Sequence, residues 1–449
     1  MFKKFFCVIL SIVIFAGAFS VFAAGFTPTD FEIRAESALL VSLDNNSVLY
    51  TKKADEKRYP ASLTKIMTAL LLIENTKDLN KEKITVSKNA VDSLLGTGSS
   101  LGGLKEGEVV TAKQMLYILL MSSANEGAMA IAEHYGQTVD NFVKMMNERA
   151  KTLGMKNTHY ANPHGLFDEE HYTTVNDMYK LVKEALSHDI FKKVVSSKQY
   201  DMPKTNKNPA RRLVTTNFLM LAYYPEYYYK YASGIKTGFT DEAGRCLIST
   251  ATKDGYSYLC ILMKSTAYDK NHNYVRYEFE DSRKLYEWAF NDFEYKALVT
   301  KDQIVGEATV NLSFDTDYVS YVPSKDFSAI IPKNADSSTI QFMVNLSRKS
   351  FDAPIKAGQK LGTADIMFAN EKMGQVDIVA SQNVDRSIIL YIWNIIKNVF
   401  SSKAMKVFAS LVVLALILFI GSCIYLNRKR NKKRIKKYKK MRSKDYYDK

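Results

Sequence analysis

The pattern of apolar and polar positions changes along the chain and predicts several distinct parts. An apolar run from Phe5 to Phe22 lies near the start, and a second run without charge extends from Val407 to Leu426. Between them, residues 30–292 show strand-like alternation at both ends and helical periodicity in the middle. Residues 294–382 show only short alternating runs separated by turn clusters. The pattern predicts an α+β domain and then a small all-β domain, between two apolar segments.

The predicted α+β domain begins with a hairpin and ends with strands and a helix. Residues 38–43 and 48–51 flank the sequence D-N-N-S, which is typical of a hairpin turn. Helical periodicity, N-caps and C-terminal glycines predict helices over about 66–75, 111–121, 126–134, 140–153 and 174–186. Three adjacent strands are predicted at 231–236, 246–252 and 256–264, before a closing helix at 274–290. The elements place strands at both ends of the domain, with helices between, which is an α+β pattern.

Two cysteines, Cys246 and Cys260, lie in the last two predicted strands. The dipeptide Asp254-Gly255 predicts a two-residue hairpin turn, in which Cys246 faces Met263 and Cys260 faces Ser249. Successive side chains of a strand point to opposite faces. We therefore expect the two thiols on opposite faces of the sheet, as small buried side chains without a disulfide.

The start of the chain has the organisation of a secretory signal peptide. Two lysines precede the apolar run, and Ala23-Ala24-Gly25 follows it. A charged region, an apolar region and a small-residue cleavage site predict a signal peptide over residues 1–24. The apolar run is slightly long for this class, so an uncleaved membrane anchor is the alternative.

The end of the chain predicts a membrane anchor. The 407–426 segment is long enough to cross a bilayer as a helix. The tail from 427 to 449 carries thirteen Lys and Arg residues against two Asp residues. Basic residues just beyond a span mark its cytoplasmic side, so the body of the protein is expected outside the cell. Residues 387–400 are largely apolar and predict a helix in the membrane interface, with an ordinary linker helix as the alternative.

The net charge of the chain belongs mainly to this tail. The whole chain carries +15 and the tail +11, and Lys3 and Lys4 lie in the predicted signal peptide. Only +2 remains for the folded part. A nucleic-acid-binding domain needs a basic face, so a nucleic-acid partner is not expected.

A candidate nucleophile follows the first hairpin. Residues 62–65 read S-x-x-K, and the apolar run 66–73 predicts a buried helix directly after them. Residues i and i+3 share one helix face, so Ser62 and Lys65 are expected side by side at the helix N-terminus. A lysine held neutral by burial next to a serine forms a nucleophile with its base. The motif alone is weak, because residues 233–236 repeat it.

Two further motifs make the signal specific. Residues 123–125 read S-A-N and residues 236–238 read K-T-G, and this order resembles that of the serine penicillin-recognising enzymes. The lead-in at 54–60, N-P-H-G-L at 162–166 and S-G-I-K-T-G-F-T at 233–240 are similar to the low-molecular-mass penicillin-binding proteins. These are the serine D-alanyl-D-alanine carboxypeptidases, and the similarity covers roughly residues 35–290, with a weaker likeness to about 380. The resemblance implies a β-lactamase/transpeptidase-like fold, an antiparallel sheet beside a helical cluster.

The resemblance also implies a role for each motif residue. Ser62 would attack the carbonyl of the penultimate D-alanine, Lys65 would be the base, and Ser123 would relay a proton to the leaving amine. The residues implied in substrate binding are Asn125, Lys236, Thr237, Gly238, Phe239 and Arg276. Within this set, Lys236 and Thr237 would bind the terminal carboxylate, and the Phe239 N–H would join that of Ser62 in an oxyanion hole. Arg276 is included only because of its approximate position relative to the sequences of this family.

Each of these residues also has a purely structural interpretation. Ser123 and Asn125 are residues that commonly cap a helix, and the K-T-G sequence suits an exposed strand end. His164 is interpreted as structural, because Lys65 already supplies a base. Residues 168–171, with the sequence D-E-E-H, are interpreted as a solvated loop. Since the sequence contains no H-E-x-x-H motif, we expect neither a metal nor a cofactor.

The resulting hypothesis is a membrane-anchored carboxypeptidase that trims the terminal D-alanine from peptidoglycan stem peptides. β-Lactam antibiotics would be its covalent inhibitors, and its location would be the bacterial cell membrane, with one span and an extracellular catalytic domain. A β-lactamase is one alternative, but residues 157–167 contain no Asp or Glu for deacylation. A non-catalytic cell-wall binding protein with the same fold is the other alternative, and the intact motifs argue against it.

Overall fold

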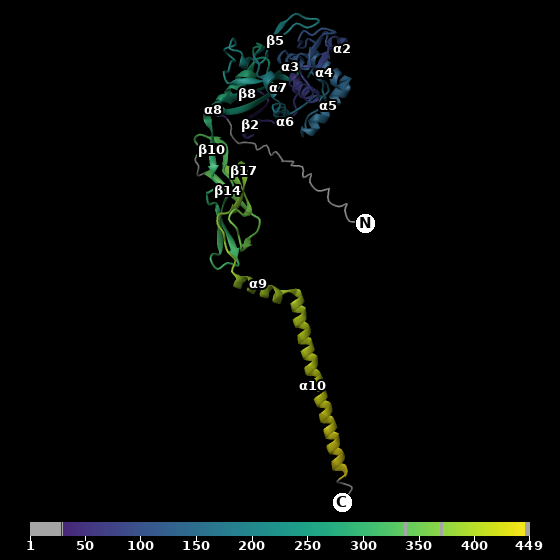
Figure 1. Cartoon of the computed structure of the whole chain (residues 1–449), viewed down its shortest axis with the longest axis vertical. Coiled ribbons are helices and arrows are strands. Elements are labelled where there is room, and N and C mark those ends of the chain that lie inside the picture. The colour runs from purple at the N-terminus through teal and green to yellow at the C-terminus, as the bar shows by residue number, and fades with distance from the viewer. Residues whose placement is uncertain (1–27, 29, 336–338, 369–370, 445–449) are drawn as a thin grey trace. The chain divides into compact units, whose positions relative to one another are not determined.

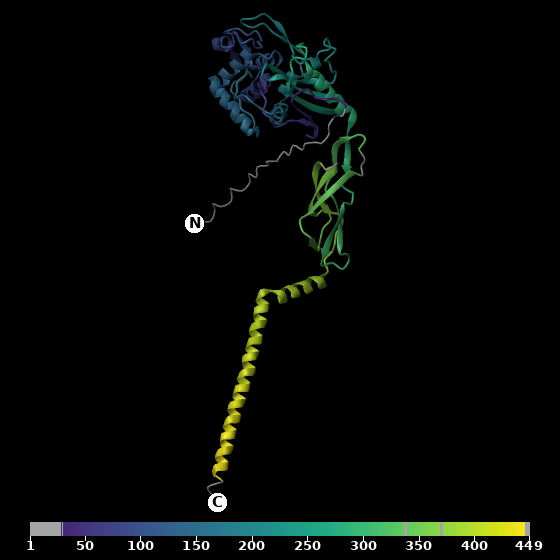
Figure 2. The ribbon, with the colours of Figure 1, turned by 180° about the vertical axis from the view of Figure 1, so that it is seen from behind.

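The computed structural model describes residues 28, 30–335, 339–368 and 371–444. These residues form two compact units, each shown from opposite sides in Figures 1 and 2. The N-terminal unit extends to Leu298 and takes in residues 328–341 and 367–373, and the C-terminal unit contains the rest. The predicted signal peptide lies outside the described residues.

A five-stranded antiparallel sheet forms the centre of the N-terminal unit, in the order β2-β1-β9-β8-β7 (Figure 1). Its strands are β1 (Ser37–Ser42), β2 (Val48–Lys52), β7 (Ala232–Thr240), β8 (Gly244–Lys253) and β9 (Tyr256–Ser265). β1 pairs with β9, with Ser37 opposite Met263. The hairpin predicted at the start of the domain and the strands predicted at its end therefore belong to one sheet.

Helices lie on both sides of this sheet. They are α1 (Lys65–Asn75), α2 (Lys88–Asp92), α3 (Ala112–Met121), α4 (Asn125–Gly136), α5 (Val139–Thr152), α6 (Val175–Ala185), α7 (Asp189–Val195) and α8 (Tyr277–Asp292), with short 3-10 helices η1 (Ala61–Thr64) and η2 (Phe218–Met220). Local chemistry fixes their ends: Thr111 and Gln114 form a capping box at α3. Thr174 caps α6, and Gly154 follows α5 with a φ of +71°.

The two faces of the sheet are buried in separate apolar cores. Ile248 and Ile261 belong to the larger core, which the helices α1 to α7 share. Leu247 and Leu262 belong to the smaller core, together with Tyr286 of α8. We call the first the inner face and the second the outer face. Neighbouring residues of β8 and β9 enter different cores. The alternating pattern in the sequence therefore corresponds to side chains that point in turn to the inner and the outer face.

The cysteines follow this alternation. Cys246 belongs to the inner core and Cys260 to the outer core, and both are free. Their predicted placement on opposite faces is confirmed, and Cys260 lies opposite Ser249 as expected. A register shift between Arg245 and Leu247 interrupts the predicted pairing of Cys246 with Met263. Such a bulge cannot be predicted from the alternation of apolar residues in the sequence.

Several short elements were not predicted from the sequence. They are α2, α7, and the strand pairs β3 (Lys83–Thr85) with β4 (Val109–Thr111), β5 (Gln199–Met202) with β6 (Arg211–Val214) and β10 (Phe293–Val299) with β13 (Phe327–Pro332). The β5–β6 hairpin is polar and is held by Glu108, which accepts hydrogen bonds from Thr205 and Asn208 in its loop. Met202 and Leu213 also enter the larger apolar core, but each strand has only four residues, too few for a period to be recognised in the sequence.

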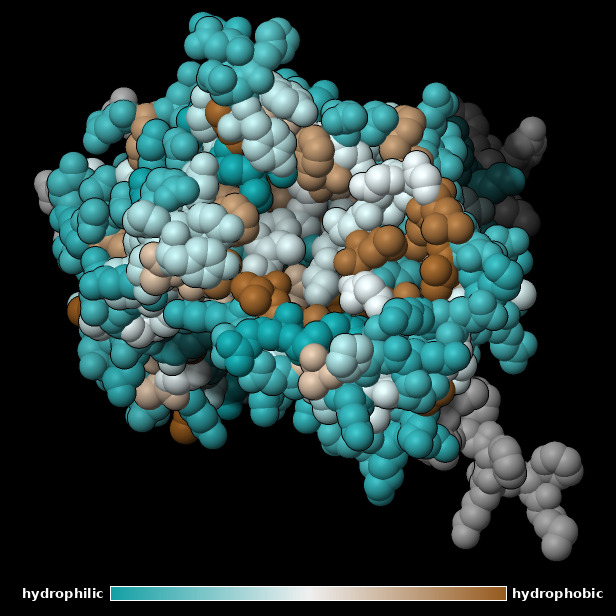
Figure 3. Space-filling model, turned by 90° about the horizontal axis from the view of Figure 1, so that it is seen from above, coloured by the Kyte–Doolittle hydropathy of each residue, from teal (hydrophilic) through white to brown (hydrophobic). Residues whose placement is uncertain are grey.

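One face of the N-terminal unit is largely hydrophilic (Figure 3). Figure 3 shows this face, hollowed near the centre, where side chains of intermediate hydropathy and small apolar patches gather. A mostly polar surface suits a unit that folds in water.

The C-terminal unit contains a six-stranded sheet in the order β14-β16-β17-β12-β11-β15. Its strands are β11 (Gly306–Asn311), β12 (Tyr318–Pro323), β14 (Ile340–Leu346), β15 (Ser350–Asp352), β16 (Lys360–Phe368) and β17 (Glu371–Ala380). Val319, Leu361 and Ile378 are fully buried. The small all-β part expected after the α+β part is present.

Two helices end the described chain, α9 (Ile388–Ser401) and α10 (Lys403–Lys444). In the described part of the chain, Lys403–Lys439 is the one helical stretch that is long and apolar enough to cross a membrane, and its apolar window is not buried. The apolar side chains of α9, including Ile389 and Trp393, are likewise exposed.

Candidate active site

Ser62 and Lys65 come together at the start of the first helix. Ser62 lies in the 3-10 helix η1, and Lys65 begins α1. We expected Ser62 at the N-terminus of the α-helix. It lies instead in the 3-10 turn that directly precedes this helix. The Lys65 Nζ donates a hydrogen bond to the Ser62 Oγ at 2.8 Å, because the i, i+3 spacing brings the side chains together in a 3-10 turn as well.

Lys65 is fully buried, and its surroundings disfavour its charge. Its Nζ also donates to the backbone carbonyl of His164 at 2.6 Å. Burial, and then the cation of Lys236, hold the pKa of Lys65 well below its usual range, against a smaller opposing effect of Glu126. A neutral lysine amine can accept the proton of the hydroxyl that it contacts.

Lys236 extends from β7 to the opposite wall of the same site. Its Nζ donates to the Ser123 Oγ at 3.0 Å and to the Thr237 carbonyl at 2.8 Å. Burial lowers the pKa of Lys236 to about 7. The expected role of Lys236 in binding a carboxylate requires its charged form, and burial makes that charge dependent on pH.

Ser123 lies in the sharp link between α3 and α4, and Asn125 is the first residue of α4. Ser123 has a φ of +56°, which is uncommon for a residue with a side chain. The N-cap of α4 is Ala124, and no side-chain oxygen caps this helix. The capping interpretation of the two residues is therefore wrong. Among the described residues, the buried Oδ1 of Asn125 has no hydrogen-bond partner, so an acceptor is left for a ligand N–H.

Gly238 lets β7 pass directly beside the nucleophile turn. A Cβ atom on Gly238 would lie 3.1 Å from the Ser62 nitrogen and 3.2 Å from the Pro60 carbonyl oxygen. The neighbouring side chain, Thr237, shares a hydrogen bond of 2.6 Å with Thr216. Phe239 follows, and its ring lies under the guanidinium of Arg245.

Arg276 lies on the outer side of the sheet and is already paired. Its Nε donates to the Glu278 Oε1 at 2.7 Å, and its guanidinium lies over the rings of Phe218 and Phe279. No hydrogen bond or ion pair in the described structure joins Arg276 to Ser62, Lys65 or Lys236.

A set of polar contacts that holds the nucleophile turn was missed by sequence reasoning. His171 is buried, and its Nδ1 accepts the Ala161 N–H. Its Nε2 must then carry the proton and donate to the Thr64 Oγ1, which in turn donates to the Ala61 carbonyl. Ala61 has a φ of +48°. Burial lowers the pKa of His171 to about 4, so the ring stays neutral. The interpretation of residues 168–171 as a solvated loop is therefore wrong for His171.

The neighbouring loop fits against the same turn. A Cβ atom on Gly165 would lie 1.9 Å from the Ala61 carbonyl oxygen. The His164 ring accepts the Leu166 N–H, and burial lowers its pKa to about 3. His164 therefore contributes its carbonyl rather than its ring to Lys65. The motif N-P-H-G-L at residues 162–166 was the feature of the sequence that indicated this loop.

One group of potential metal ligands comes together in the described residues: Glu74, Glu184 and His188. Arg149 forms ion pairs with both of these carboxylates. The arrangement is that of a salt bridge joining three helices, α1, α5 and α6.

Comparisons with known proteins agree over most of the chain. Residues 24–267 match the family model of the D-alanyl-D-alanine carboxypeptidases, and residues 293–386 match that of the penicillin-binding protein 5 C-terminal domain. The chain is 31% identical over 358 residues to the D-alanyl-D-alanine carboxypeptidase DacF of Bacillus subtilis, covering 79% of this chain and 86% of the relative. It is 27% identical over 379 residues to DacC of Escherichia coli, covering 83% and 90%.

Solved structures agree on the fold. Penicillin-binding protein 5 of Haemophilus influenzae superimposes with a TM-score of 0.60 at 24% identity, covering 81% of this chain and 100% of that one. The DD-transpeptidase of Streptomyces K15 gives a TM-score of 0.52 at 29% identity, covering 59% and 99%. The expected fold class is confirmed.

Proposed function

The chain belongs to the D-alanyl-D-alanine carboxypeptidase family of serine hydrolases, and from this premise we propose that Ser62 removes the terminal D-alanine of peptidoglycan stem peptides. The observation that carries this assignment is the 2.8 Å contact between the Ser62 Oγ and the buried Nζ of Lys65. A serine hydroxyl becomes a strong nucleophile when an adjacent base takes its proton.

In the acylation step, the Lys65 amine takes the Ser62 proton while the Oγ attacks the carbonyl carbon of the penultimate D-alanine. The negative charge that develops on the carbonyl oxygen is stabilised by the backbone N–H groups of Ser62 and Phe239. The contact of Gly238 with the Ser62 nitrogen supports this placement, because it brings the β7 backbone next to the η1 backbone.

The leaving amine of D-alanine then needs a proton. Ser123 passes its proton to it and regains one from Lys65, which took the proton of Ser62, so that Lys65 is neutral again. The Lys236 Nζ stays charged and holds the Ser123 hydroxyl in place by donating a hydrogen bond to its Oγ. The C–N bond breaks, D-alanine leaves, and Ser62 retains the acyl group. A water molecule next attacks the acyl carbon and gives a proton to the neutral Lys65. Lys65 passes this proton to the Ser62 Oγ as the bond between the Oγ and the acyl carbon breaks, which restores the Ser62 hydroxyl.

Recognition of the substrate falls to the polar groups around this centre. Lys236 and Thr237 bind the terminal carboxylate, and the free Oδ1 of Asn125 accepts the N–H of the substrate amide. We assign no substrate contact to Arg276, because its guanidinium is already paired with Glu278 on the outer side of the sheet. Penicillins present a carboxylate beside a strained amide, so they enter the same site and acylate Ser62.

We further propose that the chain is anchored in the bacterial cell membrane by α10. The long apolar stretch of this helix and the basic residues that follow it support one span with the tail in the cytoplasm. The catalytic unit then lies outside the cell, where peptidoglycan is. α9 lies in the membrane interface, because it combines exposed apolar side chains, such as Ile389 and Trp393, with the polar residues Asn394 and Lys397.

The assignment of Ser62 is tested by Ser62→Ala. This variant should neither release D-alanine from a pentapeptide nor form a covalent adduct with a fluorescent penicillin, while its melting temperature stays within a few degrees of the original. Labelling of the variant at the original rate would mean that another residue is the nucleophile. In the unmodified protein, an adduct that persists for minutes fits a carboxypeptidase, whereas turnover within seconds would indicate a β-lactamase.

A further inference from the structure

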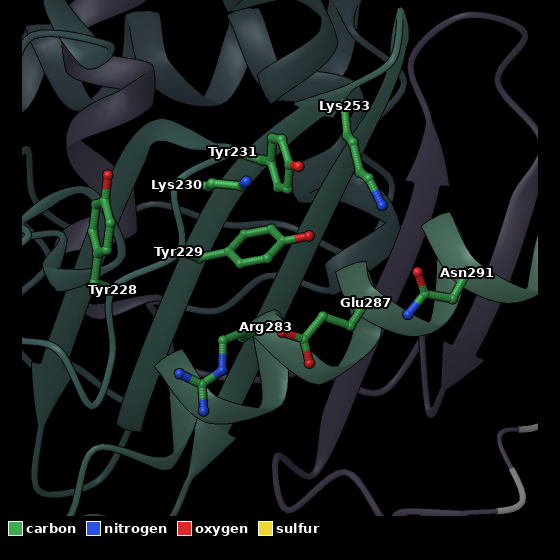
Figure 4. Close-up of a pocket in the computed structure, with 8 residues that line it drawn as sticks. All are labelled: Tyr228, Tyr229, Lys230, Tyr231, Lys253, Arg283, Glu287 and Asn291. Atoms are coloured by element: carbon green, nitrogen blue, oxygen red, sulfur yellow. The ribbon is translucent and has the colours of Figure 1, made fainter.

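A second hollow lies on the outer face of the N-terminal unit, on the other side of the sheet from Ser62. It has a volume of about 470 Å³ and is open to solvent. Its walls come from the segment before β7, the end of β8 and one side of α8, and its lining residues are Tyr228, Tyr229, Lys230, Tyr231, Lys253, Arg283, Glu287 and Asn291 (Figure 4). We call it the α8 pocket. Sites for small ligands have volumes of this order.

The charges of the α8 pocket are not neutralised within the protein. Three cations, Lys230, Lys253 and Arg283, face one carboxylate, Glu287. None of the four has an ion pair among the described residues, and the contact made by Arg283 is a hydrogen bond to the Glu226 carbonyl.

Two arginines elsewhere in this unit form ion pairs. Arg34 binds Glu280 and Asp281 on the same helix α8, and Arg58 binds Glu36 and Glu56. The unpaired cations of the α8 pocket therefore leave a local excess of positive charge that suits an anionic ligand.

The floor of the α8 pocket is aromatic and rigid. Tyr229 stacks on Tyr286 at 6.0 Å between ring centroids and meets the edge of Tyr231 at 5.4 Å. The ammonium groups of Lys230 and Lys253 lie 4.8 Å and 5.7 Å from the centroid of the Tyr231 ring. Two cations thus lie over the ring of Tyr231, which is turned by 70° from the plane of the Tyr229 ring.

Hydrogen-bonding groups complete the α8 pocket. Figure 4 shows the hydroxyls of Tyr229 and Tyr231 and the side chains of Lys253 and Asn291 around a common space, with the Glu287 carboxylate on the side of Arg283. Burial, and then the Glu287 carboxylate, raise the pKa of Tyr229, so its phenol keeps its proton. Glu287 accepts hydrogen bonds, Lys253 donates them, and the Asn291 amide and the phenols do both.

We propose that the α8 pocket binds a sugar ring that carries an anionic group, a carboxylate or a phosphate. The ring hydroxyls match Glu287, Asn291 and the phenols, the C–H face of the ring matches the tyrosine surface, and the anion matches Lys230 and Lys253. A free inorganic anion would use only the cations, and an uncharged sugar would leave them unpaired. The α8 pocket would hold the enzyme on an anionic glycan of the cell envelope while Ser62 acts from the opposite face.

The test measures binding to the full-length chain in detergent by isothermal titration calorimetry at low salt. The probes are tetragalacturonate, glucose 6-phosphate, maltotetraose and inorganic phosphate. We expect binding of at least one of the two anionic sugars, and affinities at least tenfold weaker for maltotetraose and for inorganic phosphate. Whether tetragalacturonate or glucose 6-phosphate binds more tightly distinguishes a carboxylated from a phosphorylated glycan.

Three variants locate the binding. Lys253→Glu should weaken binding of the anionic sugar at least tenfold, and Tyr231→Ala should weaken it without changing the weak binding of inorganic phosphate. The matched control is Lys151→Glu on the exposed side of α5, which should stay within twofold of the original. Penicillin acylation of Ser62 should stay within twofold in all three variants, which shows that the fold is kept.

The proposal is overturned if neither anionic sugar binds, or if maltotetraose or inorganic phosphate binds as tightly as the anionic sugars. It is also overturned if Lys253→Glu and Lys151→Glu have the same effect, because the binding would then follow net charge rather than the α8 pocket.

Discussion

At the scale of single residues, the two buried lysines have different roles although their surroundings are similar. Lys65 touches the nucleophile, and Lys236 touches Ser123. Lys65 has to lose and regain a proton in every cycle, whereas Lys236 meets a carboxylate and serves best when charged. Arginine keeps its charge at every working pH, so the same substitution affects the two positions differently.

Lys65→Arg should therefore abolish penicillin acylation, with a loss of at least about a thousandfold from pH 6 to pH 10. Lys236→Arg should keep part of the rate, with most of its loss in substrate recognition, because a planar guanidinium does not fit every ammonium site. The measurement is the second-order acylation rate constant of both variants across this range. Equal rates in the two variants would remove Lys65 from the role of base.

The burial of Lys236 also predicts how substrate binding depends on pH. Its pKa is lowered to about 7, so in the free enzyme its positive charge is present below this pH and is lost above it. The KM for a pentapeptide with a free carboxylate should rise as the pH increases through 7. The KM of Lys236→Arg should stay flat over the same range. A KM of the unmodified enzyme that does not change between pH 6 and pH 9 would contradict this assignment of charge.

At the scale of the elements, the active site depends on close backbone contacts at glycines. The loop with N-P-H-G-L meets η1 at Gly165, and β7 meets η1 at Gly238. These contacts set the position of Ser62 from two directions. His171 and Thr64 add hydrogen bonds to the same turn, whose Ala61 is held at a positive φ.

Gly165→Ala should therefore be costly for both stability and catalysis. Its Cβ would lie 1.9 Å from the Ala61 carbonyl oxygen at a φ of +89°, and the clash and the backbone strain together should cost about 3 kcal/mol of unfolding free energy. The matched control is Gly154→Ala, at a φ of +71° with open space around it. It should cost only about 1 kcal/mol.

Urea denaturation gives both free energies, and penicillin acylation reports the site. Gly165→Ala should slow acylation, and Gly154→Ala should leave it unchanged. If both variants lose the same stability and retain the same rate, then the contact with Ala61 does not hold the nucleophile turn.

The sequence was informative where chemistry or periodicity is local. The β8–β9 hairpin was predicted from Asp254-Gly255 and the alternation around it, and the α3 cap from Thr111. The sequence was uninformative where a feature of the structure depends on tertiary contacts. Nothing in the spacing shows that Ser62 occupies a 3-10 turn, because that depends on Gly165 and His171 from a distant loop. The lowered pKa of Lys236 depends on burial, which the motif K-T-G does not reveal.

At the scale of the whole molecule, the two C-terminal helices predict different modes of membrane attachment. α10 is long enough to span a bilayer, whereas α9, with 14 residues, is too short. α9 can therefore bind only at the surface of the bilayer.

A chain that ends after residue 385 should be secreted in soluble form and should retain penicillin labelling. A chain that ends after Ser402 keeps α9, and it should sediment with membranes and be released by alkaline carbonate. Fractionation of cells that express each form gives the result. If the shorter chain stays in the membrane, an anchor exists upstream of residue 385. If the longer chain is soluble, α9 is only a linker.

The pairing of β1 with β9 has a consequence for export. Ser37 near the start of the body lies opposite Met263, so the central sheet is completed only when the chain has been made, or has crossed the membrane, to about residue 265. Pairings between such distant residues form slowly. A chain that crosses the membrane from its N-terminus is therefore still unable to close its sheet while it is being threaded. In the export that we propose, the late arrival of the partner strand of β1 would keep the chain unfolded until the catalytic unit has crossed the membrane.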